Sequence, residues 1–333
     1  ETSINIEPII KKGANVVGEI RSRNREFRDE YIVIGAHFDH IGMGGPGSGS
    51  RKPEADQIHP GADDNASGTS GLLELAQKLS ANVGHLKRSV LLVAFDAEEK
   101  GLLGSKHFIK SSPVDIKNIT TMINMDMIGR MSDSSYTVGG VGTSPYFEHL
   151  LDSLKRGRFF NLIMNKPGFG PSDHAAFYSE NIPVLFFFSG FHDEYHTPDD
   201  TWQLINLKGE KYILDFIYDL VFHLARSPEK PVFQEAGPKQ GQMGSPRKFN
   251  VTFGIMPSYG STKIGLEIDA ISKEDGPAAV AGMKKGDVIK SINNKPIKDI
   301  YEYMDRLGDI KPGMTVPVLI ERKEKEITID VTF

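Results

Sequence analysis

Four short runs of apolar residues that do not alternate with polar residues predict the buried strands of a parallel sheet. They cover residues 31–36, 90–95, 122–125 and 183–188. Apolar residues three and four positions apart over 67–79 and 211–225 predict amphipathic helices between and after these strands. This alternation predicts an α/β domain whose mostly parallel sheet is covered by helices on both faces. In such a domain, ligands bind beyond the carboxyl ends of the strands.

The pattern changes after the last predicted helix. Residues 227–248 are rich in proline and glycine and have no apolar period, which predicts a linker. Short alternating strands follow over residues 249–333 and predict a small β-rich module. We therefore expect a first domain at residues 1–226, in which residues 1–12 form the tail of a preceding segment.

Charge and composition narrow the classes of partner. The chain of 333 residues has a net charge of -5 and contains no cysteine. Without a basic surface field, we do not expect binding to nucleic acid or to an anionic membrane. The longest apolar run, residues 182–188, is far shorter than the ~20 residues of a membrane-spanning helix. Without cysteine there are no disulfides and no thiolate ligands, so any metal must bind to histidine and carboxylate.

Side chains that can bind metals follow each predicted strand. Parallel strands open their C-terminal loops on one edge, so we expect these groups to share one crevice. Taken singly, each is more often a turn former or a helix cap, but their joint occurrence favours a metal site. Imidazole and carboxylate ligands suit zinc, with manganese or cobalt as substitutes. The residues are His37, Asp39, His40, Asp63, Asp64, Glu98, Glu99, Asp126, His192 and His196.

These residues stand in motifs that resemble the co-catalytic zinc exopeptidases, which include secreted bacterial leucyl aminopeptidases. The resemblance covers about residues 15–226, and it implies the phosphorylase/hydrolase-like sheet sandwich of that family and two zinc ions per chain. The motifs lie at residues 37–40, 61–68, 98–105, 124–129, 172–174 and 195–198. The implied ligands are Asp63 as the bridge, His37 and Asp126 on one ion, and Glu99 and His196 on the other.

Further details follow from this resemblance. The family places a cis peptide after the bridging aspartate, here between Asp63 and Asp64. Glu98 and its neighbour Glu99 point to opposite sides of an extended segment, so Glu98 stays free as the general base. Asp39 lies two residues after His37, where its carboxylate can accept the second imidazole N–H.

The group that stabilises the oxyanion is left open. Some relatives place a tyrosine just before the Ser-Asp-His motif, whereas this chain has Phe169 in that segment. A metal, His174 or Tyr195 can polarise the substrate carbonyl instead. His174 is equally suited to a structural role, with a hydrogen bond to Asp173.

The C-terminal module resembles a PDZ domain. Its carboxylate-binding loop would be formed by Phe253, Gly254 and Ile255, whose backbone N–H groups capture a peptide C-terminus while the peptide adds a strand. Pro257 lacks an N–H where the recognition strand begins, which weakens the groove. The alternative is a packing or regulatory domain that binds no free peptide. The motifs that carry the resemblance lie at residues 265–268, 276–283, 286–289 and 292–296.

The sequence therefore predicts a di-zinc aminopeptidase that releases N-terminal residues from peptides, at an extracytoplasmic location implied by the family. A first alternative is a mono-zinc glutaminyl cyclase of the same fold, which lines its pocket with tryptophan; this chain has only Trp202. A carboxypeptidase of the same fold is a second alternative. A third is a scaffold that has lost its metals, which the complete set of candidate ligands disfavours.

Overall fold

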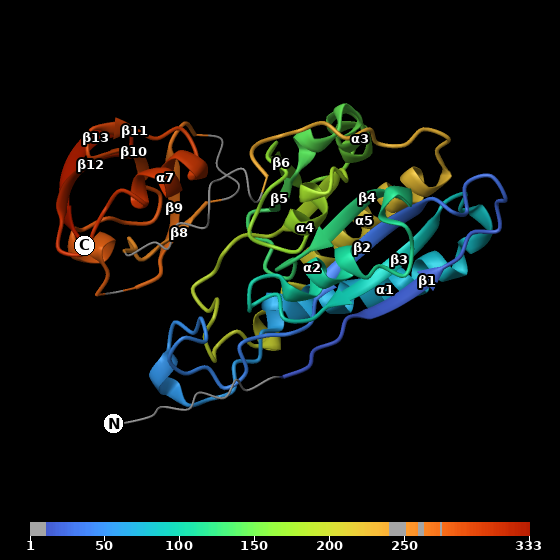
Figure 1. Ribbon diagram of the computed structural model, residues 1–333, viewed down its shortest axis with the longest axis horizontal. Coiled ribbons are helices and arrows are strands. Elements are labelled where there is room, and N and C mark those ends of the chain that lie inside the picture. Colours follow the sequence, from blue (N-terminus) through green and yellow to red (C-terminus); the bar gives the residue numbers. More distant parts are fainter. Residues whose placement is uncertain (1–10, 240–250, 259–262, 274) are drawn as a thin grey trace, which may run out of the picture.

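The computed structural model describes residues 11–239, 251–258, 263–273 and 275–333, which form two domains (Figure 1). The first domain is built on a seven-stranded sheet with the order β1-β3-β2-β4-β7-β5-β6. All four predicted strands are present, as β2, β3, β4 and β7. The strands of this sheet are β1 (Val16–Ile20), β2 (Tyr31–His37), β3 (Ser89–Phe95), β4 (Ile119–Met125), β5 (Ser135–Gly139), β6 (Asn161–Met164) and β7 (Val184–Phe188).

The centre of the sheet is parallel and its flanks are mixed. Strands β3, β2, β4 and β7 run in one direction, whereas β1 is antiparallel to β3 and β5 is antiparallel to β7. Every residue of β2, β4 and β7 is buried, because helices cover both faces of these strands. Strand β1 is exposed over its first four residues, so it lacks the apolar run that identified the central strands.

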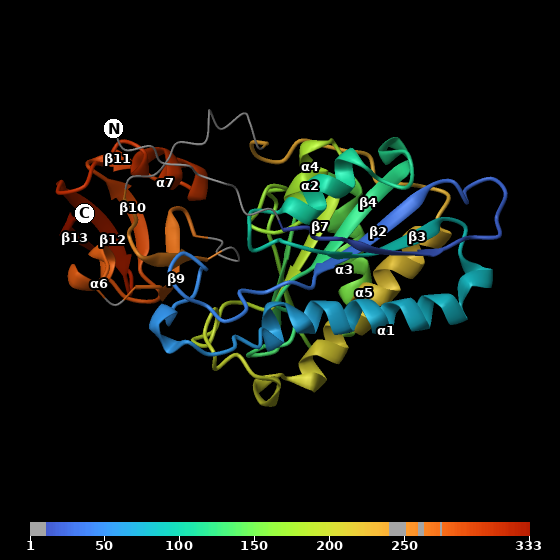
Figure 2. The same cartoon turned by 60° about the horizontal axis from the view of Figure 1, so that its bottom comes forward.

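Helices pack on both faces of this sheet, as predicted (Figure 2). Helices α1, α3 and α5 share one apolar core with the sheet, while α2 and α4 share the other. The described helices all lack the combination of length and apolar character needed to cross a bilayer. The helices of this domain are α1 (Gly68–Ala81), α2 (Leu103–Lys110), α3 (Pro145–Lys155), α4 (His174–Ser179) and α5 (Leu207–Arg226).

The second domain is small, antiparallel and β-rich, as predicted. Its sheet has the order β13-β12-β10-β9-β8, with β11 paired to β10, and it encloses a core of its own. Strand β8 lies at one end of this order. The elements are β8 (Ile255–Pro257), β9 (Leu266–Ile271), α6 (Pro277–Val280), β10 (Val288–Ile292), β11 (Lys295–Pro296), α7 (Ile300–Leu307), β12 (Thr315–Arg322) and β13 (Lys325–Thr332).

The predicted linker at 227–248 begins later than expected. Its first part packs on the first domain: the N–H of Gln234 donates to the Thr143 carbonyl at 2.8 Å, and the N–H of Gly168 donates to the Ala236 carbonyl at 2.8 Å. Pro and Gly make this segment irregular, but its backbone groups are still paired with the domain. Composition alone therefore misplaced the boundary. The rest of the predicted linker and most of the predicted N-terminal tail lie outside the described residues.

A buried arginine fixes the start of the same segment. The Arg88 side chain is 1% exposed, and its Nε donates to Glu30 Oε2 at 2.7 Å. Its Nη1 donates to the carbonyls of Leu224 at 2.9 Å and Ser227 at 2.6 Å, where α5 ends. Because a buried guanidinium needs every donor paired, residues just past the helix form part of the first domain.

Truncation tests this boundary. We expect a chain that ends at Lys239 to keep these contacts, whereas one that ends at Ser227 should lose several hydrogen bonds and the contact of Phe233 with Tyr178. The shorter chain should therefore unfold about 5 to 10 °C lower, from about 1 kcal/mol per lost bond. Thermal unfolding followed by circular dichroism measures this difference. Equal melting temperatures would show that the segment contributes nothing.

Candidate metal centre

Six side chains meet where the central strands end, at the edge where an open parallel sheet binds ligands. They come from the last residue of β2, from the loops after β2, β3, β4 and β7, and from the turn that precedes α1. All six belong to the candidate set drawn from the sequence. The family resemblance assigned no ligand role to His40 or Asp64. The residues are His37, His40, Asp64, Glu99, Asp126 and His196.

The first group of potential ligands contains His37, Asp64 and Asp126. His37 Nε2 lies 3.3 Å from Asp64 Oδ1 and 3.3 Å from Asp126 Oδ1. Ligand atoms at ~2.0–2.1 Å from a tetrahedral zinc are separated by about 3.3 Å. The spacing of this group therefore fits a zinc ion, and the side chains are of the types that zinc prefers.

The second group uses the other oxygen of the same aspartate. Asp64 Oδ2 lies 3.0 Å from His196 Nε2, which in turn lies 3.3 Å from Glu99 Oε1. His40 Nδ1 is 2.8 Å from the same glutamate oxygen. The two oxygens of Asp64 thus face two separate ligand groups, which is the position of a carboxylate that bridges two metal ions.

This arrangement corrects the predicted bridge. The structure places Asp64 between the groups, whereas the carboxylate of Asp63 turns away. Asp63 Oδ1 accepts hydrogen bonds from the Gly129 N–H at 2.7 Å and the Ser67 hydroxyl at 2.9 Å. The cis peptide likewise lies between Asp64 and Asn65, one position later than predicted. Two adjacent aspartates are chemically identical in sequence, and only the path of the turn decides which one faces the cluster.

A further carboxylate that sequence reasoning missed supports this turn. Asp200 is fully buried, and its Oδ2 accepts hydrogen bonds from the backbone N–H groups of Asp63 at 3.0 Å and Asp64 at 3.2 Å. These bonds hold the turn in place from the loop after β7. No feature of the sequence distinguishes Asp200 from its neighbour Asp199, which instead pairs with Lys52 at the surface.

His37 and His196 are oriented by backbone carbonyls. His37 Nδ1 lies 3.1 Å from the Asp39 carbonyl, and His196 Nδ1 lies 3.0 Å from the Gly49 carbonyl. An Nδ1–H that donates to a carbonyl leaves the Nε2 lone pair free for a metal. His196 also has a left-handed backbone with φ of 56°, a conformation found at functional sites.

Asp39 acts differently from the prediction. Its backbone carbonyl, and not its carboxylate, accepts from His37; the carboxylate oxygen Oδ1 is 3.8 Å from His37 Nδ1. The carboxylate instead accepts hydrogen bonds from the backbone N–H groups of Glu98 at 2.9 Å and Glu99 at 3.3 Å. The chain bends after His37, so the alternation expected of an extended strand no longer applies. Asp39 therefore positions the segment that carries both glutamates.

Opposite charges balance within the cluster. Burial raises the pKa of Asp64, but hydrogen bonds with His196 and His37 outweigh this effect and hold the pKa well below its usual value. Burial lowers the pKa of His37, yet Asp126 and Asp64 raise it well above its usual value. For His196, hydrogen bonds to Asp64 and Glu99 overcome burial and raise the pKa to about 10. Without metal, protonated imidazoles offset the buried carboxylates; a divalent cation would offset them equally.

Glu98 lies beside these groups without belonging to either. Burial, with the nearby carboxylates of Asp126 and Asp173, raises the pKa of Glu98 to about 10, although His37 lowers it. Asp173 is fully buried, and burial raises its own pKa to about 7. A carboxyl group whose pKa is raised by burial in a crevice is typical of a residue that exchanges protons.

The cluster opens into a cavity of about 280 Å³. Its polar end is formed by Asp64, Glu98, Glu99, Asp126 and His196. Its other walls are apolar and aromatic, and part of one wall comes from strand β8 of the second domain. Such a cavity suits an apolar side chain attached to a polar group that faces the carboxylates. The apolar lining is Met127, Pro171, Phe186, Phe188, Phe191, Tyr195, Ile255, Met256 and Pro257.

The two candidates for the oxyanion role are placed differently. Tyr195 lines this cavity, and its ring stacks on His196 with 3.8 Å between the centroids. Burial raises the pKa of Tyr195 well above its usual value, so its hydroxyl stays protonated and can donate. His174 lines a neighbouring cavity and stacks on Phe186 at 4.5 Å. Its Nδ1 has no hydrogen-bond partner within the described ranges, so the expected bond to Asp173 is not formed.

The predicted carboxylate-binding loop contacts both the core of the second domain and the metal-centre cavity. The Phe253 ring is fully buried against Phe333, while the Ile255 side chain lines the metal-centre cavity. The N–H of Gly254 donates to the Thr252 hydroxyl at 3.1 Å. This loop therefore lies beside the cluster, and one of its amides is already engaged.

Comparisons with known proteins agree with the division of the chain into two domains. Residues 15–221 match the model of peptidase family M28, and residues 265–333 match that of the PDZ domain. Over 68 residues, 41% are identical to the serine endoprotease DegS of Escherichia coli strain K12, which covers 20% of this chain and 19% of DegS. The second domain is thus a PDZ domain at the C-terminal end of the chain described here.

The first domain resembles aminopeptidases in sequence and structure. Over 228 residues the chain is 27% identical to aminopeptidase YwaD of Bacillus subtilis strain 168, covering 65% of this chain and 46% of that protein. An aminopeptidase structure from Aneurinibacillus sp. strain AM-1 superposes with a TM-score of 0.54 and 26% identity, covering 68% of this chain and 51% of the other. A zinc aminopeptidase structure from Bacillus subtilis gives a TM-score of 0.52 and 26% identity, covering 67% and 53%. The chain spans about half the length of these relatives, and since the family model matches most of it, the chain belongs to peptidase family M28.

Proposed function

We propose that this protein is a zinc-dependent aminopeptidase that holds two ions and hydrolyses the first peptide bond of peptides. The observation that carries the proposal is the position of Asp64, whose two oxygens lie 3.3 Å and 3.0 Å from imidazole nitrogens in two separate groups. Both groups consist of the imidazole and carboxylate ligands that zinc prefers, and manganese or cobalt could replace it.

The ligand assignment follows from the two groups. His37 and Asp126 would hold one ion, Glu99 and His196 the other, and Asp64 both. Asp126 Oδ1 and Glu99 Oε1 are buried and lie within 3.3 Å of imidazole nitrogens of the cluster, which supports a metal role for them. His40 would support Glu99 through its 2.8 Å contact. Bound zinc would polarise the substrate carbonyl and lower the pKa of a water.

Glu98 is the residue that we propose to move the proton. It lines the cavity beside both groups and is a ligand of neither. Bound cations would lower its pKa, and as general base it would then accept a proton from the attacking water and deliver it to the leaving amine. Asp39 would hold its backbone, and Tyr195 would donate its hydroxyl to the oxyanion, since His174 lies in the neighbouring cavity.

The charges of the cavity favour a substrate amine over a substrate carboxylate. Four carboxyl groups line it, and their oxygens can accept hydrogen bonds from a substrate amine. The nearby Arg130 is already paired with Glu194 at 2.7 Å, so it is not available to clamp a C-terminal carboxylate. This pairing speaks against the carboxypeptidase alternative. Trp202, which a cyclase pocket would bury, is 73% exposed.

Two further parts of the proposal rest on family membership. Peptides are the expected substrates of an M28 domain, and capture of a peptide or protein C-terminus is the expected activity of a PDZ domain. We also propose an extracytoplasmic location, as the family resemblance implies.

Metal analysis tests the bridge. We expect protein purified without chelator to bind two zinc ions per chain, and D64N to lose both, because each group loses a ligand. D63N is the matched control and should keep two, since Asp63 contacts Gly129, Ser67 and His192 instead. Inductively coupled plasma mass spectrometry counts the ions. Metal loss in D63N but not in D64N would show that Asp63 is the bridging ligand. One zinc in the unaltered protein would favour the cyclase.

Substitution within the glutamate pair tests the base. E98Q should keep both metals and lower kcat by ~10² to 10⁴, the usual contribution of a positioned acid or base. E99Q should lose metal instead, because Glu99 belongs to the second group. Hydrolysis of leucine p-nitroanilide with parallel metal analysis separates these outcomes. The roles are reversed if E98Q loses metal and E99Q does not.

Substrate chemistry tests which end is recognised. We expect hydrolysis of peptides with a free N-terminus and little or none after N-acetylation, because the acetyl group removes the amine that the carboxylates attract. Mass spectrometry of a matched peptide series follows the products. Sequential loss from the C-terminus would indicate a carboxypeptidase, and loss of ~17 mass units from N-terminal Gln without cleavage would indicate a cyclase.

A further inference from the structure

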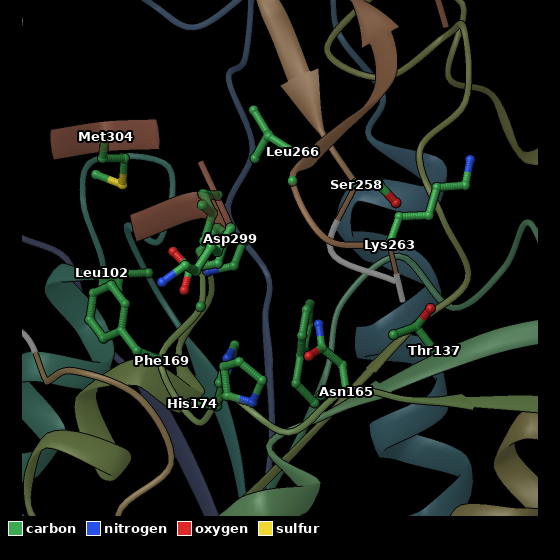
Figure 3. Close-up of a pocket in the computed structure, with 18 of the residues that line it drawn as sticks. Leu102, Thr137, Asn165, Phe169, His174, Ser258, Lys263, Leu266, Asp299 and Met304 are labelled. Atoms are coloured by element: carbon green, nitrogen blue, oxygen red, sulfur yellow. The ribbon is translucent and has the colours of Figure 1, made fainter. Parts of the chain in front are cut away.

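A second cavity of about 440 Å³ lies between the two domains. Figure 3 shows Leu102, Asn165 and His174 on the first domain facing Leu266 and Met304 on the second. Its volume is within the ~300–1,000 Å³ range of sites that hold small ligands. The mechanism proposed above uses none of these side chains, so the cavity has no assigned role.

This interdomain cavity continues from the metal-centre cavity. Pro171 and Phe186 line both of them. On the opposite wall, the metal-centre cavity is lined by β8 (Ile255–Pro257), and the next residue, Ser258, lines the interdomain cavity. The PDZ domain therefore forms a wall that passes from one cavity to the other. A peptide whose first residue lies at the metals can extend along this wall.

The two cavities differ in charge. The metal-centre cavity has four carboxylates at its polar end, whereas the interdomain cavity is lined by three lysines and one aspartate, Asp299. Lys263 is paired with Glu267 at 2.6 Å. Lys298 Nζ is 3.9 Å from Glu302, and Lys106 Nζ donates to the Gly101 carbonyl at 2.9 Å.

Lys106 and Lys298 are the cations best placed to meet a ligand. Within the described ranges, Lys106 has no carboxylate within 4.0 Å, and it comes from α2, which begins four residues after Glu99. Lys298 stands just before α7 on the PDZ domain. One lysine thus comes from each domain, and both line the same cavity.

We propose that the interdomain cavity binds the residues that follow the N-terminal residue of a peptide substrate, and that Lys106 and Lys298 select an acidic side chain there. The inference rests on the aminopeptidase function proposed above and adds a preference for the residues after the cleaved bond. The amine end of the peptide would face the carboxyl groups and its acidic part the lysines, so at each end the site carries the charge opposite to that of the substrate.

Charge reversal tests the proposal. The probes are amidated tetrapeptides with N-terminal Leu, which carry Glu or Lys at position 3 or 4 and Gly elsewhere. We expect the unaltered protein to cleave the Glu peptide with a kcat/KM about three- to tenfold above that of the Lys peptide at one of these positions. K106E and K298E should each bring this ratio to one or below.

Each variant has a matched control with the same change of charge. Lys110 lies on the same helix as Lys106, is exposed and does not line the cavity, so K110E should leave the ratio unchanged. Lys325 is the corresponding exposed control on the PDZ domain. Circular dichroism of all four variants checks that they fold.

The outcomes separate this inference from the function on which it rests. If both peptides are cleaved and neither K106E nor K298E changes the ratio, the inference is wrong while the aminopeptidase function stands. A change in K106E alone would overturn the two-domain site. If no peptide is cleaved, the proposed function fails. The inference is then tested by calorimetric measurement of the binding of the same peptides to the metal-free protein. Tighter binding of the Glu peptide that K106E and K298E abolish supports the proposed cavity site, and equal binding of the two peptides overturns it.

Discussion

The division of one carboxylate between two ligand groups is the constraint on which the site depends. Asp64 contacts His37 through one oxygen and His196 through the other, so the positions of both groups are tied to a single side chain. If this side chain moves to fit one group, it changes its distance to the other. The turn that carries it is correspondingly well held, since the buried Asp200 accepts the backbone N–H groups of Asp63 and Asp64. A displacement of this turn would change both groups together.

The energetic problem of the site is the burial of several carboxylates in one small volume. Isolated buried charges are very costly, and proteins compensate for them with partners or metals. Here His37 and His196 supply that compensation, which is why their pKa values are raised despite burial. Glu98 faces the same burial without a partner of its own, and its pKa is raised instead. The same burial thus leaves charged candidate ligands beside the histidines and, without metal, a protonated carboxyl group at Glu98.

The second domain contributes part of the wall of the metal-centre cavity. Its strand β8 lies at the end of the PDZ sheet, and Ile255, Met256 and Pro257 line the metal-centre cavity. Figure 1 shows the PDZ domain beside the end of the first domain from which the long loops extend. Arg51, on the loop after β2, lies 3.5 Å from the Ile271 carbonyl of β9 and also donates to the Asp193 carbonyl. The cavity is therefore enclosed by two domains that the sequence presents as separate units.

The sequence by itself determined the fold class, the two domains and the sheet edge that carries the candidate metal ligands. Buried strands flanked by helices on both faces are largely apolar, so the sequence shows them as apolar runs, and parallel strands bring their following loops to one edge. What only the tertiary structure decided depends on direction and on distant contacts. The choice of Asp64 over Asp63, the different use of the Asp39 carboxylate and the inclusion of His40 depend on how the backbone turns at each loop. The joining of β8 to the cavity depends on the packing of two domains far apart in sequence, and no local pattern of residues encodes such a contact.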